Sequence, residues 1–429
     1  MFLDNFRWIL IGNVATAASQ WGIIAVLARF GVPSVLGAYS LGISVAALAS
    51  GLANLELRTL QVTDAGQQTP FAVYYLLRFW MGIACVAVLS GFALVSRYSW
   101  ETRAAILALA LSKCSDGWSD TVYGRLQVRD RMALIGKSQL AKSGLFLLLP
   151  CLSLAFLPNP MWAIGSMIVP SAAVLMFYDL PNLRRHGAVS IPAAGGKSLR
   201  EFGRRMLALS KVGLPPTIVT TLVTLHVSIP RFVVASHLGE AQAGVVTALG
   251  YLAIAPNLVM VALGQAGLAP LARSFAAGDR RRYLTGVLRL VGAGVTVGAL
   301  TVTAGITLGG PILATLYGPA YAHYDRVLPL FLLAGAVSYL NAALGFGLAS
   351  ARVFGIQMPL MAVVCMVSFA TSVALAPRLG IAGAAASLVI SMLTQLFLYI
   401  ALLARKCSRR CISRRGASSR TDALLTLDL

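Results

Sequence analysis

The stretch from Ala104 to Arg129, AAILALALSKCSDGWSDTVYGRLQVR, decides the fold. Its length and its apolar first half are typical of a helix that crosses a bilayer, yet Lys113, Asp116 and Asp120 lie near its centre. At 3.6 residues per turn these three side chains share one face. A charged side chain at the bilayer centre costs about 3 kcal/mol on insertion scales, so this face has to line a bundle interior or a wet cavity. Other helices are therefore expected to enclose it.

The composition points to an integral membrane protein. Hydrophobic residues make up 58% of the chain and charged residues 11%, and the mean hydropathy is +0.79. The formal net charge of +21 could indicate a nucleic-acid partner. However, the basic residues fall between apolar segments and form neither a basic domain nor an aromatic platform, so a nucleic-acid partner is not expected.

The apolar segments predict an all-α polytopic membrane protein with about twelve transmembrane helices. The expected helices cover residues 8–30, 37–57, 72–96, 104–126, 139–157, 161–179, 212–236, 243–268, 284–308, 326–349, 356–376 and 380–404. With alternating sides, most Lys and Arg residues fall on one side, Arg58 and Lys142 among them. The other side receives only Arg29, Arg97, Arg103, Arg326 and Arg378. The positive-inside rule then places both termini in the cytoplasm.

Four cations remain inside the predicted helices and are the candidates for binding an anionic substrate. They are Arg78, Lys113, Arg231 and Arg289. Each has an alternative role: Arg78 and Arg289 could snorkel to the cytoplasmic interface, and Arg231 could anchor the outer interface.

Lys113 could simply be neutralised by Asp116 one turn away. In that case Asp120 is left without a cation and is free to bind an ion or a proton. Asp116 and Asp120 are therefore the candidates for ion coupling.

The chain divides into two halves of six helices. The predicted units are an N-terminal lobe of residues 1–180, a cytoplasmic linker of residues 181–211, a C-terminal lobe of residues 212–404 and a basic tail of residues 405–429. Within the linker, Ser198 and Glu201 form a capping box. An apolar stripe beside several Arg residues predicts a helix lying on the anionic inner leaflet, and the stripe consists of Leu199, Phe202, Met206 and Leu209. A plain solvated linker is the alternative.

Two short patterns recur between the halves at nearly the same spacing. Tyr74 and Arg78 correspond to Tyr283 and Arg289, and Gly31 corresponds to Gly239. Such a repeat favours two pseudo-symmetric lobes around a central cationic cavity, with Arg78 and Arg289 at matching depth. The six Cys residues suggest no disulfide framework, and the four His residues are too scattered for a metal site, so no metal or cofactor is expected.

The chain resembles a polysaccharide flippase of the multidrug, oligosaccharidyl-lipid and polysaccharide exporter superfamily. The loose motifs that carry this resemblance are IPRF at 229–232, HLGE at 237–240, GQA at 264–266, PLARSFAAGD at 270–279, LGIAGA at 379–384 and, in the first half, Ser119, Asp120, Tyr123, Gly124, Leu126 and Gln127. They cover nearly the whole chain.

The resemblance implies export of undecaprenyl-diphosphate-linked oligosaccharide units across the bacterial inner membrane. The units would pass from the cytoplasmic to the periplasmic leaflet, for O-antigen (lipopolysaccharide), capsule or exopolysaccharide assembly, in contact with membrane lipids and beside a polysaccharide polymerase and glycosyltransferases. A cationic lining suits such a substrate, because desolvated phosphate needs charge-assisted partners. Moving an anion outward also gains about 2.3 kcal/mol per charge per 100 mV when the inside is negative.

Three other functions fit the sequence less well than a flippase does. A cation-coupled multidrug exporter of the same superfamily is disfavoured because a cationic lining repels cationic drugs. A sugar-polymerising membrane enzyme would need a cluster of catalytic carboxylates or histidines on a sizeable loop, and the one long loop is basic. A scaffold for assembly enzymes would leave the cations inside the helices without a purpose. The sequence thus predicts a transporter and not an enzyme.

Overall fold

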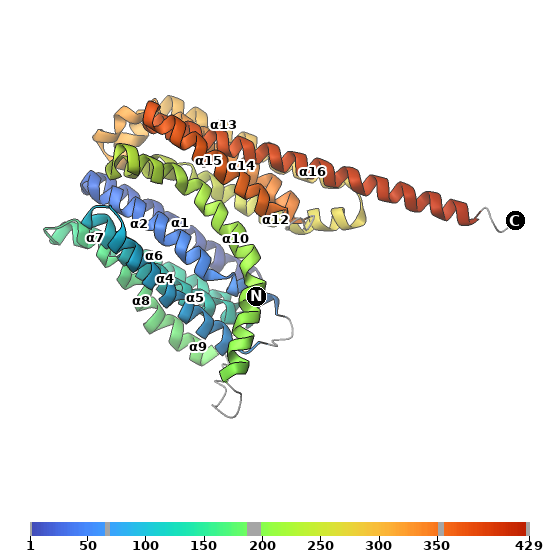
Figure 1. The fold of residues 1–429 in the computed structure, drawn as a ribbon, viewed down its shortest axis with the longest axis horizontal. Coiled ribbons are helices and arrows are strands. Elements are labelled where there is room, and N and C mark those ends of the chain that lie inside the picture. The colour runs from blue at the N-terminus through green and yellow to red at the C-terminus, as the bar shows by residue number, and fades with distance from the viewer. Residues whose placement is uncertain (1, 65–68, 187–198, 351–355, 426–429) are drawn as a thin grey trace.

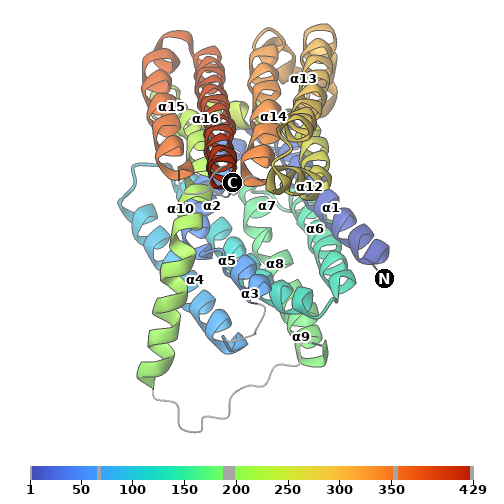
Figure 2. The same cartoon turned by 90° about the vertical axis from the view of Figure 1, so that its right-hand side faces the viewer.

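The computed structural model describes residues 2–64, 69–186, 199–350 and 356–425. Every regular element in these ranges is helical (Figures 1 and 2), which confirms the predicted all-helical class. The first part of the chain forms α1 (Phe2–Phe30), α2 (Pro33–Asn54), α3 (Leu57–Thr63), α4 (Phe71–Val95), α5 (Trp100–Val128), α6 (Met132–Phe156), α7 (Met161–Ser166), α8 (Ile168–Val174), the π-helical turn η1 (Leu175–Asp179) and α9 (Leu180–His186). The second part forms α10 (Leu199–Leu238), α11 (Glu240–Tyr251), α12 (Ile254–Ala277), α13 (Arg280–Tyr317), the 3₁₀ turn η2 (Pro319–Tyr324), α14 (Leu328–Ser350), α15 (Gln357–Leu379) and α16 (Ile381–Leu425).

Ten helical segments of the described chain are long and apolar enough to cross a membrane. The pair α11 and α12, bent by 49°, makes an eleventh if it is one broken span. Each of the twelve predicted segments coincides with helix, but α5 falls outside this set because its centre is charged. The chain is therefore a multi-pass membrane protein, and the count of twelve stays a prediction.

The helices form two groups that are close together at one end and diverge toward the end where both termini lie (Figure 1). Helices α1 to α9 pack mainly among themselves, as do α12 to α16. Helix α10 contacts both groups, and α11 packs mainly against α2 of the first group. One hydrophobic core joins the groups where they meet and includes Leu27, Tyr39, Val234 and Tyr317, all almost fully buried. The convergent end is the one predicted to face the periplasm.

Close backbone contact holds the two groups together at this end. An added Cβ at Gly37 of α2 would lie 2.3 Å from the carbonyl oxygen of Glu240, so no larger residue fits there without separating the helices. Beside it, Ser40 donates a hydrogen bond of 3.0 Å to the carbonyl of Ala243. The carboxylate of Glu240 also accepts bonds from the backbone N–H of Ser99 at 2.9 Å and from the Ser99 hydroxyl at 2.6 Å.

The predicted amphipathic helix of the linker is the first part of α10, which continues into the membrane without a break. Ser198, the expected cap, lies outside the described residues. Met206 and Leu209, from the apolar stripe, pack against the buried Leu55 and Tyr74 of the first half. This end of α10 therefore contacts protein at these two partly buried residues. The expectation that its stripe lies on the inner leaflet stays a prediction. The domain boundaries themselves stay predictions.

Candidate functional site

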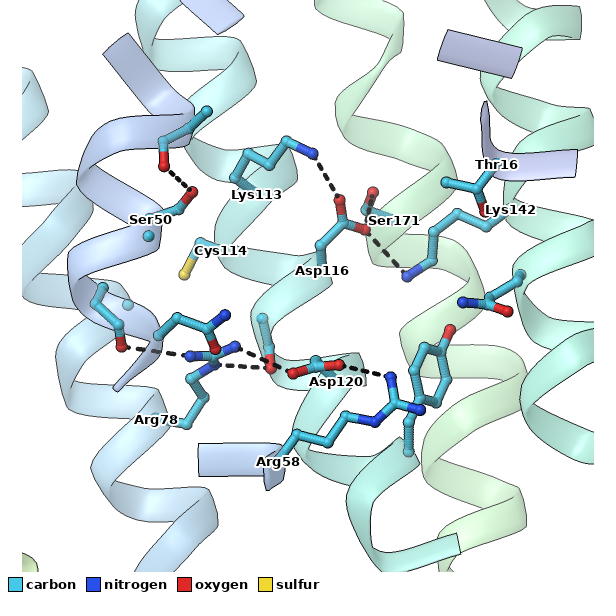
Figure 3. A pocket seen from close by; sticks show the side chains of 18 of the residues that line it. Thr16, Ser50, Arg58, Arg78, Lys113, Cys114, Asp116, Asp120, Lys142 and Ser171 are labelled. Carbon is cyan, nitrogen blue, oxygen red and sulfur yellow. Dashed lines mark hydrogen bonds and ion pairs between the residues drawn. The ribbon is translucent and has the colours of Figure 1, made fainter. Parts of the chain in front are cut away.

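A cavity of about 410 Å³ lies within the first half of the chain. Residues from α1, α2, α3, α4, α5, α6 and α8 line it. Six of them are charged: Arg58, Arg78, Lys113, Asp116, Asp120 and Lys142. Figure 3 shows these side chains turned toward one another from α3, α4, α5 and α6. The predicted polar face of α5 therefore lines a cavity and does not face lipid.

Asp116 lies between two lysines that approach it from opposite sides (Figure 3). Its Oδ1 is 3.0 Å from Nζ of Lys142, and its Oδ2 is 3.6 Å from Nζ of Lys113. Ser171 of α8 donates a further hydrogen bond of 2.9 Å to Oδ1. The expected contact between Lys113 and Asp116 is present, and Lys142 joins it as a second cation.

Asp120 lies one turn further along α5 and is held between two arginines. Its Oδ1 is 3.0 Å from Nη1 of Arg58, and its Oδ2 is 3.6 Å from Nη2 of Arg78. Arg58 also donates to the side-chain oxygen of Gln127 from Nη2 at 3.0 Å. The expectation that Asp120 has no cation partner is therefore wrong, because α3 and α4 each supply an arginine.

Arg78 is the least exposed of these cations, with 7% of its side chain accessible against 28% for Lys113. Its Nε donates to the carbonyl of Gly117 at 2.9 Å, and its Nη1 donates to the carbonyl of Ala53 at 3.3 Å. A Cβ at Gly117 would come within 2.9 Å of that Nε, so a glycine is needed for the guanidinium to reach α5. Arg78 thus ties α4 to both α2 and α5 as well as lining the cavity.

Arg231 lies elsewhere, in a second hollow of about 530 Å³ lined by residues of α10, α11, α12, α14 and α16. Its Nη1 donates to the hydroxyl of Ser44 of α2 at 3.3 Å, across the contact between the two groups of helices. Its guanidinium also lies 6.0 Å from the ring centre of Tyr251. Most of the other residues that line this hollow are uncharged, so it differs in character from the cavity around α5.

Arg289 lines a third hollow, between α12 and α13, beside Arg281, Arg282 and Asp279. Its side chain is exposed, whereas Arg78 is buried. The alternative of an arginine that reaches an interface therefore fits Arg289 better than substrate binding. The four predicted cations do not share one central cavity among the described residues. Arg78 and Lys113 are together, and Arg231 and Arg289 are each in a separate hollow.

Comparison with known proteins places this geometry in context. No protein-family model matches the chain. It is similar to the capsular polysaccharide biosynthesis protein CapF of Staphylococcus aureus, with 21% identity over 400 residues, which is 92% of this chain and 98% of that protein. Among solved structures it resembles the lipid II flippase MurJ in an inward closed conformation, with a TM-score of 0.71, 11% identity, and coverage of 94% of this chain and 87% of that one. It also resembles an inward-facing multidrug resistance MATE family transporter, with a TM-score of 0.64, 14% identity, and coverage of 93% and 94%.

The chain has the fold of these two transporters, the second of which is named as a member of the MOP superfamily. The predicted resemblance is thus supported by a separate comparison of sequences and by the structure. The similar proteins are named as transporters or as a polysaccharide biosynthesis protein, in agreement with the expectation of a non-enzymatic role.

Three side chains around the cavity were not among the predicted site residues. The sequence pattern places Lys142 among the loop cations. It follows Gln139 at helical spacing, however, and both side chains line the cavity. Arg58 was also assigned to a loop, and its place depends on a backbone corner at Leu55 and Glu56, where φ is 48° and 46°. The third is Asp179, which lies buried behind the cavity wall in η1.

Proposed function

We propose that the protein is a flippase that moves lipid-linked oligosaccharides from the cytoplasmic to the periplasmic leaflet of the bacterial inner membrane. The observation that carries the proposal is the charge of the cavity in the first half. Four cations and two carboxylates line it, which gives a net charge of +2 in a hollow between the helices. A diphosphate is an anion of matching charge, and arginine and lysine are its usual partners.

The two carboxylates have a role in this scheme. Four cations facing one another would repel, and Asp116 and Asp120 each contact two of them and together offset half of their charge. Lys113 and Arg58 are the more exposed members of their pairs and can turn toward an arriving phosphate while Lys142 and Arg78 hold the carboxylates. The predicted ion-coupling role of Asp116 and Asp120 stays a proposal, and neutralising the empty site is the task that their contacts support directly.

The MurJ and CapF similarities support the same substrate class. MurJ is named as a flippase of lipid II, and CapF is named for capsular polysaccharide biosynthesis. We therefore propose a polyprenyl-diphosphate-linked saccharide as cargo. Undecaprenyl diphosphate is the predicted carrier, and the polymerase and glycosyltransferases of the same assembly line are the predicted partners.

A multidrug exporter is the second candidate, since a MATE transporter shares the fold. The positive cavity opposes the binding of cationic drugs, because like charges repel. Competition experiments separate the two candidates. A polyprenyl diphosphate should displace a bound fluorescent anion, whereas a cationic dye should not.

The direct test is flipping of a fluorescent polyprenyl-diphosphate saccharide in proteoliposomes, followed by quenching from outside. The double variant Lys113→Ala with Lys142→Ala should lose most of the flipping rate, because it removes both ammonium groups around Asp116. Arg289→Ala removes one positive charge from an exposed site outside the cavity and serves as the matched control. Wild-type flipping by the double variant would refute the proposed role of the cavity.

A further inference from the structure

The side chain of Asp179 is an acid with no cation partner among the described residues. It is 1% exposed, whereas Asp116 and Asp120 are partly exposed and each contact two cations. One of its oxygens, Oδ2, has no hydrogen-bond partner. An ionised carboxyl group buried in this way is costly, and taking up a proton removes the charge. The sequence suggested that Asp120 is a carboxylate without a cation partner, and in the structure Asp179 has this property among the described residues.

A chain of hydrogen bonds connects Asp179 to the cavity wall. The hydroxyl of Ser138 donates to Oδ1 of Asp179 at 2.6 Å. Since Ser138 has a single hydrogen to give, the hydroxyl of Tyr123 donates to Ser138, at 2.7 Å. The ring of Tyr123 lines the cavity and lies 5.7 Å from both the Lys142 ammonium and the Arg58 guanidinium.

The helix around Asp179 is distorted at this residue. Asp179 ends the π-helical turn η1, which interrupts the span Met161–His186. Such turns are rare and occur frequently at functional sites. Next to it, Leu180 and Leu183 pack in an apolar cluster with Val122 and Leu126 of α5. The carboxyl group is thus held between a polar cavity wall and an apolar core.

The charged and titratable groups near Asp179 come from three elements. Lys142 on α6 and Asp116 on α5 act on it electrostatically, as does Tyr123 on α5, and Tyr178 is its neighbour on η1. Ser119 of α5 is also close, and its hydroxyl likewise has no hydrogen-bond partner. A proton on Oδ2 would supply a donor for such a partnerless oxygen.

We propose that Asp179 is a proton-binding residue that sets the charge of the substrate cavity. With Asp179 ionised, the cavity and its wall carry four cations and three carboxylates, a net charge of +1. When Oδ2 takes a proton from water, an O–H bond forms there and the net charge becomes +2. The return of the proton to water restores the first state. A proton and an anionic substrate therefore favour each other's binding, and by linkage the effect is reciprocal.

The proposal favours a proton over a metal ion. No group of three or more His, Cys, Asp or Glu side chains that could hold a metal occurs in the part of the chain that the structure describes. A proton binds a single oxygen atom, whereas a metal ion needs several ligands arranged around it.

The inference depends on the proposed anion-binding cavity only in its second part, so the experiment has two stages. The first measures the infrared carboxyl bands of the purified full-length protein between pH 5 and pH 9, without any ligand. The wild-type protein should show a titrating band that is missing in Asp179→Asn. Asp325→Asn, which changes an exposed acid between η2 and α14, should keep it. Absence of a titrating Asp179 band, or a band that responds to sodium at constant pH, would overturn the proposal.

A second variant protects the first stage against misfolding of Asp179→Asn. Ser138→Ala keeps the carboxyl group but removes a hydrogen bond that stabilises its ionised form, so the band should titrate at higher pH. If the band of Ser138→Ala titrates where the wild-type band does, the assignment to Asp179 is wrong.

The second stage adds inorganic pyrophosphate as the probe. Wild type should bind pyrophosphate more tightly at low pH than at high pH. The ratio of these two affinities should be about tenfold larger for wild type than for Asp179→Asn, as expected for a coupled pair of sites. Pyrophosphate should also move the Asp179 titration to higher pH. A titrating band that pyrophosphate does not move, in a protein that binds pyrophosphate, refutes the link. A titrating band in a protein that does not bind pyrophosphate counts against the proposed cavity function and leaves the proton site supported.

Discussion

Replacing Arg78 and Arg58 separately by alanine distinguishes an arginine that holds the fold from one that receives substrate. Both contact Asp120, but Arg78 also donates to two backbone carbonyls, those of Gly117 and Ala53. Hydrogen bonds from a charged group contribute about 1.5–3 kcal/mol each, so Arg78→Ala should lower the free energy of unfolding by about 3 kcal/mol or more.

Arg58→Ala should cost much less. The side chains of Arg58 and Asp120 are each 29% exposed. Water therefore screens the attraction between them and can hydrogen-bond to either side chain when the other is removed. An ion pair of this kind is worth about 0–1 kcal/mol. Stability can be measured by titrating the purified protein with sodium dodecyl sulfate and following helical circular dichroism.

The transport assay should give the opposite order. Arg58→Ala should lower the flipping rate while the protein stays stable. Arg78→Lys keeps the charge but loses the several N–H donors of the guanidinium, so it should keep part of the flipping rate and lose stability. Equal losses of stability in Arg78→Ala and Arg58→Ala would refute the reasoning, since the difference in burial and partners would then have no energetic consequence.

Three further outcomes are expected. Lys142→Ala should abolish surface polysaccharide in cells with normal protein levels, because it removes the closer of the two lysines at Asp116, and wild-type polymer would contradict this. Arg289→Ala should leave both polymer and flipping unchanged, as an exposed residue outside the cavity, and a strong loss in either assay would argue for a role of that hollow. Glu240→Gln should weaken the contact between the halves, because the Glu240 carboxylate accepts hydrogen bonds from Ser99 and, at 2.5 Å, from the hydroxyl of Thr102. Double electron–electron resonance between labels on α5 and α11 should then show a broader distance distribution, and an unchanged distribution would show that the carboxylate is not needed there.

The helices and the polar face of α5 could be predicted from sequence, because both depend on local patterns. Runs of apolar residues long enough to cross a bilayer mark the helices, and Lys113, Asp116 and Asp120 recur at helical spacing. The membrane makes such patterns especially informative, since the backbone there has to satisfy its own hydrogen bonds.

The grouping of the cations could not be predicted in the same way. Arg58 reaches Asp120 only because the chain turns at Leu55 and Glu56, two residues in a left-handed conformation that is uncommon for residues with a side chain. The expected equivalence of Arg78 and Arg289 came from a repeat in the sequence. The first is buried between helices and the second is exposed, because the residues around them differ although the spacing is alike.

The length of α10 has a mechanical consequence. This single helix of 40 residues packs at its start on the first half, through Met206 and Leu209, and further along beside α15 of the second. At 1.5 Å per residue it is a rod of about 60 Å. Any rocking of one half against the other has to bend this rod, and Pro215, Pro216 and Pro230 are the joints at which its backbone bonds are already interrupted. The stiffness of these joints would then set the pace of each transport cycle.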